Sequence, residues 1–325
     1  MTNQYEILGV GTPILDHLLQ VSQDYLNTVP GDPYGMELVS YQEIVDLIEK
    51  SGTVPQQIAG GSCCNAIKGL TSLGHSCGFV GKVGKGPTGE KVINDLQDIG
   101  VNPLLSYSNS PTAHVVCLIT PDGKRTCRSF IGAGAELTPD ELDPELFQGV
   151  KLVHIEGYSL LIPGLTHRIM EYAKDAGAVI SFDMGSFEVI ESYRELLVDL
   201  ITEYVTVLFS NEEETKALTG KGPKEGCEEL RKRCEIAVVM IGDKGCWVGS
   251  SEGCTHYPAY PVKPIDTTGA GDLFASGFLH GYLTGRPLDL CAKFGALTGR
   301  AVVQVVGAEI PSSQWAEILE EIESS

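Results

Sequence analysis

The sequence predicts an α/β protein in which a large, mostly parallel sheet stands beside a smaller β-sheet. Beyond residue 150, buried strands alternate with amphipathic helices, and this alternation is typical of βαβ units on a parallel sheet. Between residues 104 and 133 the pattern changes to two β-rich runs, which predict a hairpin. The chain has 325 residues, enough for one large core. We therefore expect a single domain, 1–325, whose smaller sheet is formed by about 16–61 and 104–133.

Elements in the first half of the chain are predicted from apolar runs and helix caps. Ser40 and Glu43 have the spacing of a capping box, so they predict a helix that continues to Lys50. Gly74 and Gly100 mark the expected ends of two further helices. The predicted strands are 5–11, 17–22, 77–84, 112–120 and 124–130, and the predicted helices are 40–50, 65–73 and 90–99. The segment Pro121-Asp122-Gly123 is expected to form the turn between the last two strands.

The second half alternates more regularly between the two kinds of element. Its predicted strands are 151–157, 178–183, 205–210, 236–242 and 246–250, and its predicted helices are 165–175, 188–203 and one after residue 211. A loop then runs to Asp266, and three helices are expected to close the chain.

Composition and charge exclude several classes of protein. Lys and Arg number 23 against 43 Asp and Glu, so the net charge of −20 repels phosphate backbones and anionic lipid surfaces. No apolar run approaches the roughly 18 residues of a membrane span. The first basic residue is Lys50, which argues against a secretory or transit peptide and favours the cytoplasm. The ten cysteines lack zinc-site spacing and are expected to be reduced, mostly buried thiols.

The segment DTTGAGD, residues 266–272, carries the clearest chemical signal. Two glycines directly before an apolar helix leave the N–H groups of its first turn free to surround an anion, and the helix dipole favours negative charge there. Asp272 would repel that anion unless it takes a proton from an attacking hydroxyl group. The combination indicates phosphoryl transfer. The alternative is that Asp272 only stabilises the first turn of its helix.

Other motifs fail on their context. Residues 249–253 fit the hydrolase pattern Gly-x-Ser-x-Gly, but an extended segment follows them where a helix is required. His154 and Glu156 fit half of the zinc deaminase signature, whose cysteine half is missing, so His154 is interpreted as a core residue of a strand. No Walker A sequence occurs, and GVGTPI lacks the third glycine of a dinucleotide fingerprint.

Taken together, DTTGAGD and GGSCCNAIKGLTSLG, residues 60–74, resemble the two signatures of the ribokinase-like, phosphofructokinase-B-type kinases of sugars and nucleosides. Further similar segments follow in the family's order: GVGTPILD, DGKRT, SNEEE, IGDKGCWVG and VVGAEIP. The segments YGMELVS and GAGAELTPDELD are more similar to the adenosine kinase branch. The resemblance implies a central sheet between helices, a small β lid, and the transfer of phosphate from ATP with Mg²⁺ to a hydroxymethyl group. K⁺ is left open as a further cation.

The resemblance also implies roles for individual residues. Asp272 would be the general base, and the anion hole would be formed by Gly269, Ala270 and Gly271. The substrate would contact Asp16, Gly60, Gly61, Asn65 and Arg125. The nucleotide would contact Asn211, Gly242, Asp243, Gly245 and Thr267, and Asn211 with Glu214 would hold Mg²⁺ through water. Plainer interpretations stay open: a helix capping box for Asn211 and Glu214, a surface charge for Arg125, and turns for the glycines.

The expected substrate is adenosine or a related nucleoside, with ribose or fructose as the alternative. A catalytically silent sensor of nucleosides or sugars is a second alternative, against which the intact DTTGAGD segment argues. Thr12 stands where adenosine kinases commonly have Asn, and Cys63 and Cys64 replace a small or polar pair. Small molecules are the only partners expected, with the protein a monomer or homodimer.

Overall fold

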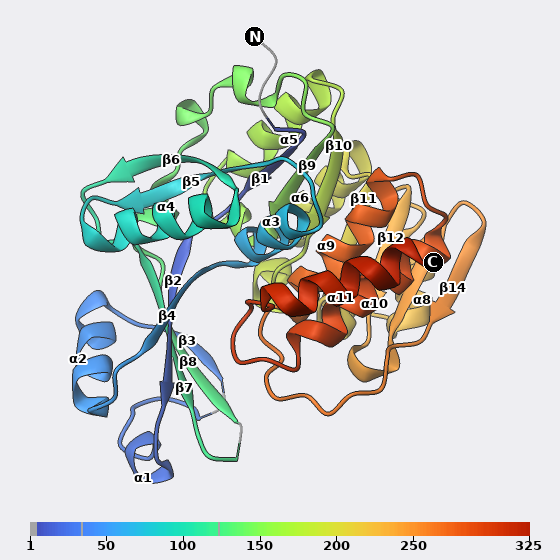
Figure 1. The fold of residues 1–325 in the computed structure, drawn as a ribbon. Helices are drawn as coiled ribbons and strands as arrows, with labels where there is room; N and C mark the ends of the chain where they lie inside the picture. Colours follow the sequence, from blue (N-terminus) through green and yellow to red (C-terminus); the bar gives the residue numbers. More distant parts are fainter. Residues whose placement is uncertain (1–4, 34, 123) are drawn as a thin grey trace.

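A nine-stranded sheet forms the centre of the protein. The computed structural model describes residues 5–33, 35–122 and 124–325 (Figure 1). The strand order is β14-β13-β12-β11-β10-β9-β1-β5-β6, parallel from β12 to β6 and antiparallel at β13 and β14. The strands are β1 Ile7–Val10, β5 Cys77–Gly84, β6 Asn102–Ser108, β9 Leu152–Glu156, β10 Val179–Asp183, β11 Val207–Asn211, β12 Ile236–Met240, β13 Cys246–Ser250 and β14 Gly253–Tyr257. The predicted α/β class with a mostly parallel sheet is confirmed.

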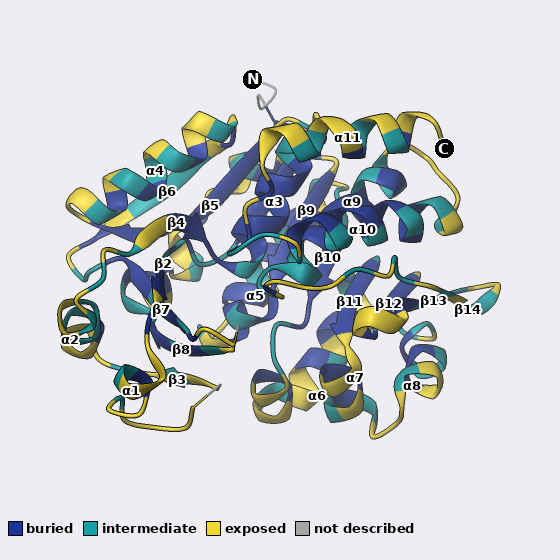
Figure 2. Ribbon diagram, turned by 60° about the horizontal axis from the view of Figure 1, so that its bottom comes forward, coloured by how far each residue is buried: buried dark blue, intermediate teal, exposed yellow. Residues whose placement is uncertain are grey.

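Helices cover both faces of this sheet. One face carries α3 Ser62–Ser72, α4 Pro87–Ile99, α9 Ala270–Leu283 and α10 Leu288–Val302, with α11 Ser312–Glu323 packed outside them. The other face carries α5 Leu165–Asp175, α6 Phe187–Tyr204, α7 Glu212–Thr219 and α8 Pro223–Leu230. In Figure 2 the inner strands of the sheet are buried, the edge strand β14 is not, and α4 and α11 expose their outer faces. This is the arrangement that a parallel sheet with crossover helices requires.

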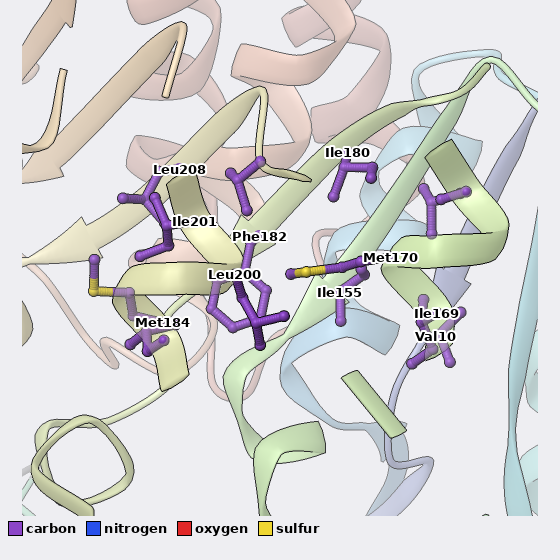
Figure 3. Close-up of a cluster of buried hydrophobic side chains, with 14 of the residues drawn as sticks. Val10, Ile155, Ile169, Met170, Ile180, Phe182, Met184, Leu200, Ile201 and Leu208 are labelled. Carbon is purple, nitrogen blue, oxygen red and sulfur yellow. The ribbon is translucent and has the colours of Figure 1, made fainter. Parts of the chain in front are cut away.

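The strands bury both faces because their side chains alternate between two cores. Val10, Ile155, Phe182 and Leu208 point toward the face that α5 and α6 cover, as Figure 3 shows. Their neighbours along the strands, Phe209 among them, join the core beneath α3 and α9. Since successive side chains of a strand point to opposite faces, a run of apolar residues fills both cores at once.

The smaller sheet, called the lid sheet below, has the order β3-β8-β7-β2-β4. Its strands are β2 Ile14–Gln20, β3 Met36–Leu38, β4 Gln56–Gly60, β7 Ala113–Ile119 and β8 Arg125–Phe130, and α1 Gln23–Leu26 and α2 Tyr41–Ser51 lie beside it. One of its faces packs on α2 around Leu19, Ile44, Val116 and Leu118. In Figure 1 this sheet extends away from the large sheet, to which β2, β4 and β7 connect it.

The structure corrects the expected extent of the lid sheet. Residues 102–108 form β6, which pairs with β5 in the large sheet, so the second lid segment begins at β7 rather than at residue 104. The predicted hairpin of β7 and β8 is confirmed, although Gly123 of its turn lies outside the described residues. Tyr34 of the segment YGMELVS lies outside them as well.

Local signals located most helix ends correctly. The capping box of Ser40 and Glu43 is present at the start of α2, and Gly100 ends α4 with a left-handed backbone conformation. The helix predicted from residue 65 begins at Ser62, because Gly61 has a φ of 107° that already turns the chain into it. The hydrolase-like residues 249–253 join β13 to β14, an antiparallel hairpin. In the described part of the chain, no helix is long and apolar enough to cross a membrane.

Candidate active site

Polar side chains gather at the carboxyl edge of the large sheet. Glu156, Asp183 and Asn211 are the last residues of β9, β10 and β11, which are neighbours in the sheet. The carboxyl edge of an open parallel sheet is where such folds bind ligands. Asp272, in the first turn of α9, lines the same cleft as Asp183 and Asn211. The N-terminus of α9 therefore reaches this edge of the sheet.

Asp272 stands in the first turn of α9 and links that helix to α3. Its Oδ1 accepts a hydrogen bond of 2.9 Å from Ser62 Oγ, and its Oδ2 accepts one of 2.9 Å from Asn65 Nδ2. Burial raises the pKa of Asp272 to about 6, although these two hydrogen bonds lower it. The carboxylate is therefore ionised at neutral pH and close to the pH at which it can take up a proton.

The turn before Asp272 forms the N-terminus of α9, and the N–H of its Ala270 donates a 3.3 Å hydrogen bond to the carbonyl oxygen of Thr267. Gly269 caps α9 with a φ of 71°, and Ala270 and Gly271 begin the helix. The N–H groups of a first helical turn have no partner within the helix, and the helix dipole makes this end positive. Ala270 and Gly271 line the cleft beside Asp272. The side chain of Asp266 fixes the start of this turn by accepting hydrogen bonds from both the N–H and the Oγ1 of Thr268.

On the lid side of Asp272, three predicted substrate residues come together. A side chain on Gly60 would collide with the Asp16 carboxylate, so any larger residue there would displace that carboxylate. Asn65 is 4% exposed, and its Oδ1 has no hydrogen-bond partner while its Nδ2 binds Asp272. An unpartnered buried acceptor is unfavourable unless a ligand supplies the donor. Burial raises the pKa of Asp16 to about 7, against the opposing charge of Lys68.

Glu156 fixes two loops on this side of the cleft. Its Oε1 accepts a 2.8 Å hydrogen bond from the backbone N–H of Thr12, and its Oε2 accepts one of 2.9 Å from the N–H of Cys63. Burial raises its pKa to about 7, and the two backbone hydrogen bonds lower it. Glu156 therefore joins the end of β1 to the start of α3. The structure gives Thr12 this backbone contact and packs its side chain against Gly134.

The predicted nucleotide residues line one cleft of about 700 Å³. It contains Asn211, Glu214, Gly242, Asp243, Gly245 and Thr267, together with Ala270, Gly271 and Asp272. The far wall is more apolar, with Tyr257, Tyr260 and Val303. The other predicted residues, Asp16, Gly60, Gly61, Asn65, Arg125 and Gly269, do not line it. Most of the predicted set therefore divides into this cleft and a lid-side group, Asp16, Gly60 and Asn65, that Asp272 connects, while Gly269 caps α9 and Arg125 pairs with Asp266.

Asn211 and Glu214 form the capping box that the sequence left as the plainer interpretation. The N–H and Nδ2 groups of Asn211 donate to the two carboxylate oxygens of Glu214 at 2.9 and 2.7 Å. Burial raises the pKa of Glu214 to about 7, with Asp272 acting in the same direction. Burial, reinforced by Glu214 and Asp272, also raises the pKa of Asp183 well above its usual range. A divalent cation in this part of the cleft would relieve that repulsion.

Arg125 of the lid sheet forms an ion pair with Asp266, which lies in the loop before α9. Its Nη1 lies 2.8 Å from Oδ1 of Asp266, the first residue of the DTTGAGD segment. Asp266 is 5% exposed and also accepts a hydrogen bond from the N–H of Gly307. The arginine therefore joins β8 to the loop that leads into α9.

The sequence reasoning missed several residues of this region. Ser62 and Lys68 lie inside the recognised glycine-rich segment but were given no role. Glu156 and Asp183 directly end buried strands, and an acidic residue at that position is a signal that could have identified them. The interpretation of His154 as a core residue is confirmed, since the residue is 1% exposed and its Nδ1 is hydrogen-bonded to Ser181 Oγ.

Comparison with known proteins agrees with this geometry. Residues 34–315 match the family described as pfkB family carbohydrate kinase. The chain is 25% identical to adenosine kinase of Saccharomyces cerevisiae, covering 95% of this chain and 97% of that one. It is 28% identical to fructokinase of Salmonella typhimurium, over 84% and 92% of the two chains. The crystal structure of adenosine kinase from Sinorhizobium meliloti superposes with a TM-score of 0.89 at 27% identity, over 98% and 99% of the chains. The chain therefore belongs to the pfkB family of carbohydrate kinases and is an ATP-dependent kinase of sugars or nucleosides.

Proposed function

We propose that this kinase phosphorylates the 5′-hydroxymethyl group of a nucleoside, with adenosine as the first substrate to test. The observation that carries the proposal is the position of Asp272 between the cleft and the lid-side group of Asp16, Gly60 and Asn65. Support for a nucleoside comes from the yeast and Sinorhizobium adenosine kinases, both similar along nearly their whole length.

In this proposal the lid-side group binds the sugar ring. The Asp16 carboxylate accepts hydrogen bonds from two neighbouring hydroxyl groups, which a carboxylate can do at once because it has two oxygens. The unpartnered Oδ1 of Asn65 accepts a further hydroxyl hydrogen. These contacts point the hydroxymethyl group toward Asp272, which takes its proton as the oxygen attacks the phosphate. The N–H groups at Gly269, Ala270 and Gly271 stabilise the transferring phosphoryl group.

ATP would occupy the cleft that Gly242, Asp243, Gly245 and Thr267 line. Asn211 and Glu214 would hold Mg²⁺ through water, and the cation, when bound, neutralises charge on the phosphates. Arg125 would contact the transferred phosphate only after leaving Asp266, with which it pairs in this structure.

A sugar kinase acting on ribose or fructose is the second candidate. The Salmonella fructokinase is 28% identical over 84% of this chain, a level comparable to the 25% over 95% of the yeast adenosine kinase.

A kinetic panel tests the proposal. ADP release with Mg-ATP is measured for adenosine, other nucleosides, ribose and fructose, and the K⁺ dependence is tested by replacing KCl with choline chloride. We expect kcat/KM for adenosine to exceed that for either free sugar by about tenfold or more, because the base adds apolar burial. A free sugar that wins by the same margin contradicts the nucleoside assignment, and binding without turnover of any compound would identify a sensor.

A further inference from the structure

Lys68 is a buried lysine beside the lid-side group. It lies in α3, only 6% of it is exposed, and its Nζ donates a 2.7 Å hydrogen bond to the carbonyl oxygen of Ala59. A buried ammonium group is costly unless opposite charge compensates for the lost water. The carbonyl of Ala59 is neutral, so the compensating charge must come from a carboxylate farther away.

Asp16 supplies a carboxylate next to the strand segment that Lys68 contacts. Ala59 directly precedes Gly60, whose Cα faces the Asp16 carboxylate so closely that a side chain there would collide with it. In the lid sheet, Ala59 is also paired with Leu15, the neighbour of Asp16. The hydrogen bond to Ala59 therefore holds the ammonium group of Lys68 next to Gly60 and opposite Leu15, the chain neighbour of Asp16.

Other charged and titratable groups around Asp16 do not replace Lys68. Asp272 and Asp266 face it and oppose its ionisation, and the thiols of Cys64 and Cys127 lie close to it. Arg125 favours its ionisation less than Lys68 does. The guanidinium of Arg125 is already paired with Asp266 at 2.8 Å. Lys68 is therefore the main cation that favours the ionised form of Asp16.

We propose that Lys68 is a positioning residue that favours the ionised form of Asp16, the form able to accept two hydrogen bonds from the substrate. The inference rests on the proposed function, in which Asp16 binds sugar hydroxyl groups. Burial alone raises the pKa of Asp16, and the charge of Lys68 opposes that rise, leaving the pKa at about 7. Without Lys68 the pKa rises further, so less of the enzyme is competent to bind at pH 7.

The test compares kcat/KM from pH 5.5 to 9.5 for the best substrate of the panel. Lys68→Met removes charge and hydrogen bond, Lys68→Gln removes the charge but keeps a donor, and Lys68→Arg keeps the charge. Lys174→Met removes one surface charge as the matched control, since Lys174 is half exposed beside Glu203. The Met and Gln variants should lose about fivefold at pH 7, with the acid limb about one pH unit higher. Both should come within about threefold of the wild type at pH 9.5.

Each outcome decides the inference. An acid limb that moves in the Met and Gln variants but stays in Lys68→Arg and Lys174→Met supports it, and the loss should lie in KM rather than kcat. An equal loss at every pH, or an acid limb that does not move, overturns it and leaves Lys68 a purely structural residue. If Lys68→Met does not fold, Lys68→Gln and Lys68→Arg still separate charge from packing. A wild-type protein inactive on the whole panel would refute the proposed function instead, a result distinct from an active enzyme whose acid limb stays fixed.

Discussion

Asp272 differs from the neighbouring carboxylates in the partners that hold it. Glu156 accepts hydrogen bonds from backbone N–H groups, and Asp183 accepts one from the N–H of Gly185. Asp272 is held only by the side chains of Ser62 and Asn65 among the contacts that the described residues make with it. Side chains can rearrange when a substrate binds, whereas backbone groups are fixed by the fold. Asp272 is therefore the carboxylate best able to exchange a partner for a substrate hydroxyl.

The residue-scale prediction concerns Asp272→Asn. The amide cannot take the proton, so kcat should fall by about 10²-fold or more, while the affinities for ATP and substrate change only a few-fold. Thermal stability should stay nearly unchanged, because the side chain of Asn65 can rotate its unpartnered Oδ1 toward the new amide. Steady-state kinetics measure kcat and the apparent affinities, and a thermal melt measures the stability. Full turnover in the variant would exclude Asp272 as the base, and an unfolded variant would favour a capping role.

The pH dependence of the wild-type enzyme provides the accompanying control. Burial raises the pKa of Asp272 to about 6, and the base must be unprotonated, so kcat should fall as the pH drops through that value. Ser62→Ala removes one of the two hydrogen bonds that lower this pKa, and the fall should then begin at a higher pH. A fall in kcat at the same pH in both proteins would contradict this assignment.

At the scale of elements, the entry into α3 positions both Ser62 and Asn65. Gly61 has a φ of 107°, and a side chain there would also collide with the carbonyl oxygen of Thr12. Gly52, at the end of α2, has a φ of 64° with nothing within 4 Å of a Cβ. Gly52 is in the left-handed helical region, with ψ of 10°, whereas Gly61 has ψ of 144° and is also crowded.

The two glycines form a matched pair of alanine substitutions. Gly61→Ala should destabilise the protein by about 3 kcal/mol, from backbone strain and collision together, and should reduce activity by displacing α3. Gly52→Ala should cost only about 1 kcal/mol and leave activity intact. Urea denaturation and the kinase assay measure both effects. Equal losses of stability in the two variants would contradict the extra cost expected at Gly61 from its backbone conformation and its contact with Thr12.

At the scale of the whole molecule, the two sheets differ in how much core supports them. The large sheet is buried on both faces, whereas the lid sheet packs on α2 around a small cluster that includes Leu19, Ile44 and Leu118 (Figure 2). Elements with fewer buried apolar contacts open at lower free energy than the rest of a protein. The lid sheet should therefore open while the large sheet stays folded.

Hydrogen exchange measured by mass spectrometry tests this difference. Peptides from β7 should exchange faster than peptides from β9, and substrate with ATP should slow exchange in β7 most. Ile44→Ala removes a core side chain of the lid cluster, at a cost of about 2–4 kcal/mol, and should speed exchange in the lid sheet alone. Ile169→Ala in α5 is the matched control and should weaken protection throughout the large sheet. Equal exchange rates in β7 and β9 would mean that the two sheets open together.

The amino-acid sequence determined the features of this protein that depend on neighbouring residues. Apolar runs located strands such as β5, the capping box located α2, and Gly100 located the end of α4, because each signal acts within a few residues of backbone. The glycine spacing before Asp272 likewise predicted the helical turn that begins α9. The resemblance of two motifs then supplied the family.

Tertiary structure decided which distant residues meet and how deeply they are buried. It assigned residues 102–108 to the large sheet, since a strand pairs with whichever edge is free and its own sequence does not specify the partner. It joined Arg125 to Asp266 and brought the charge of Lys68 near enough to act on Asp16, relations that no spacing along the chain could reveal. The raised pKa of Asp272 follows from burial, which is a property of the packed fold, so the sequence could name this residue but not its acidity.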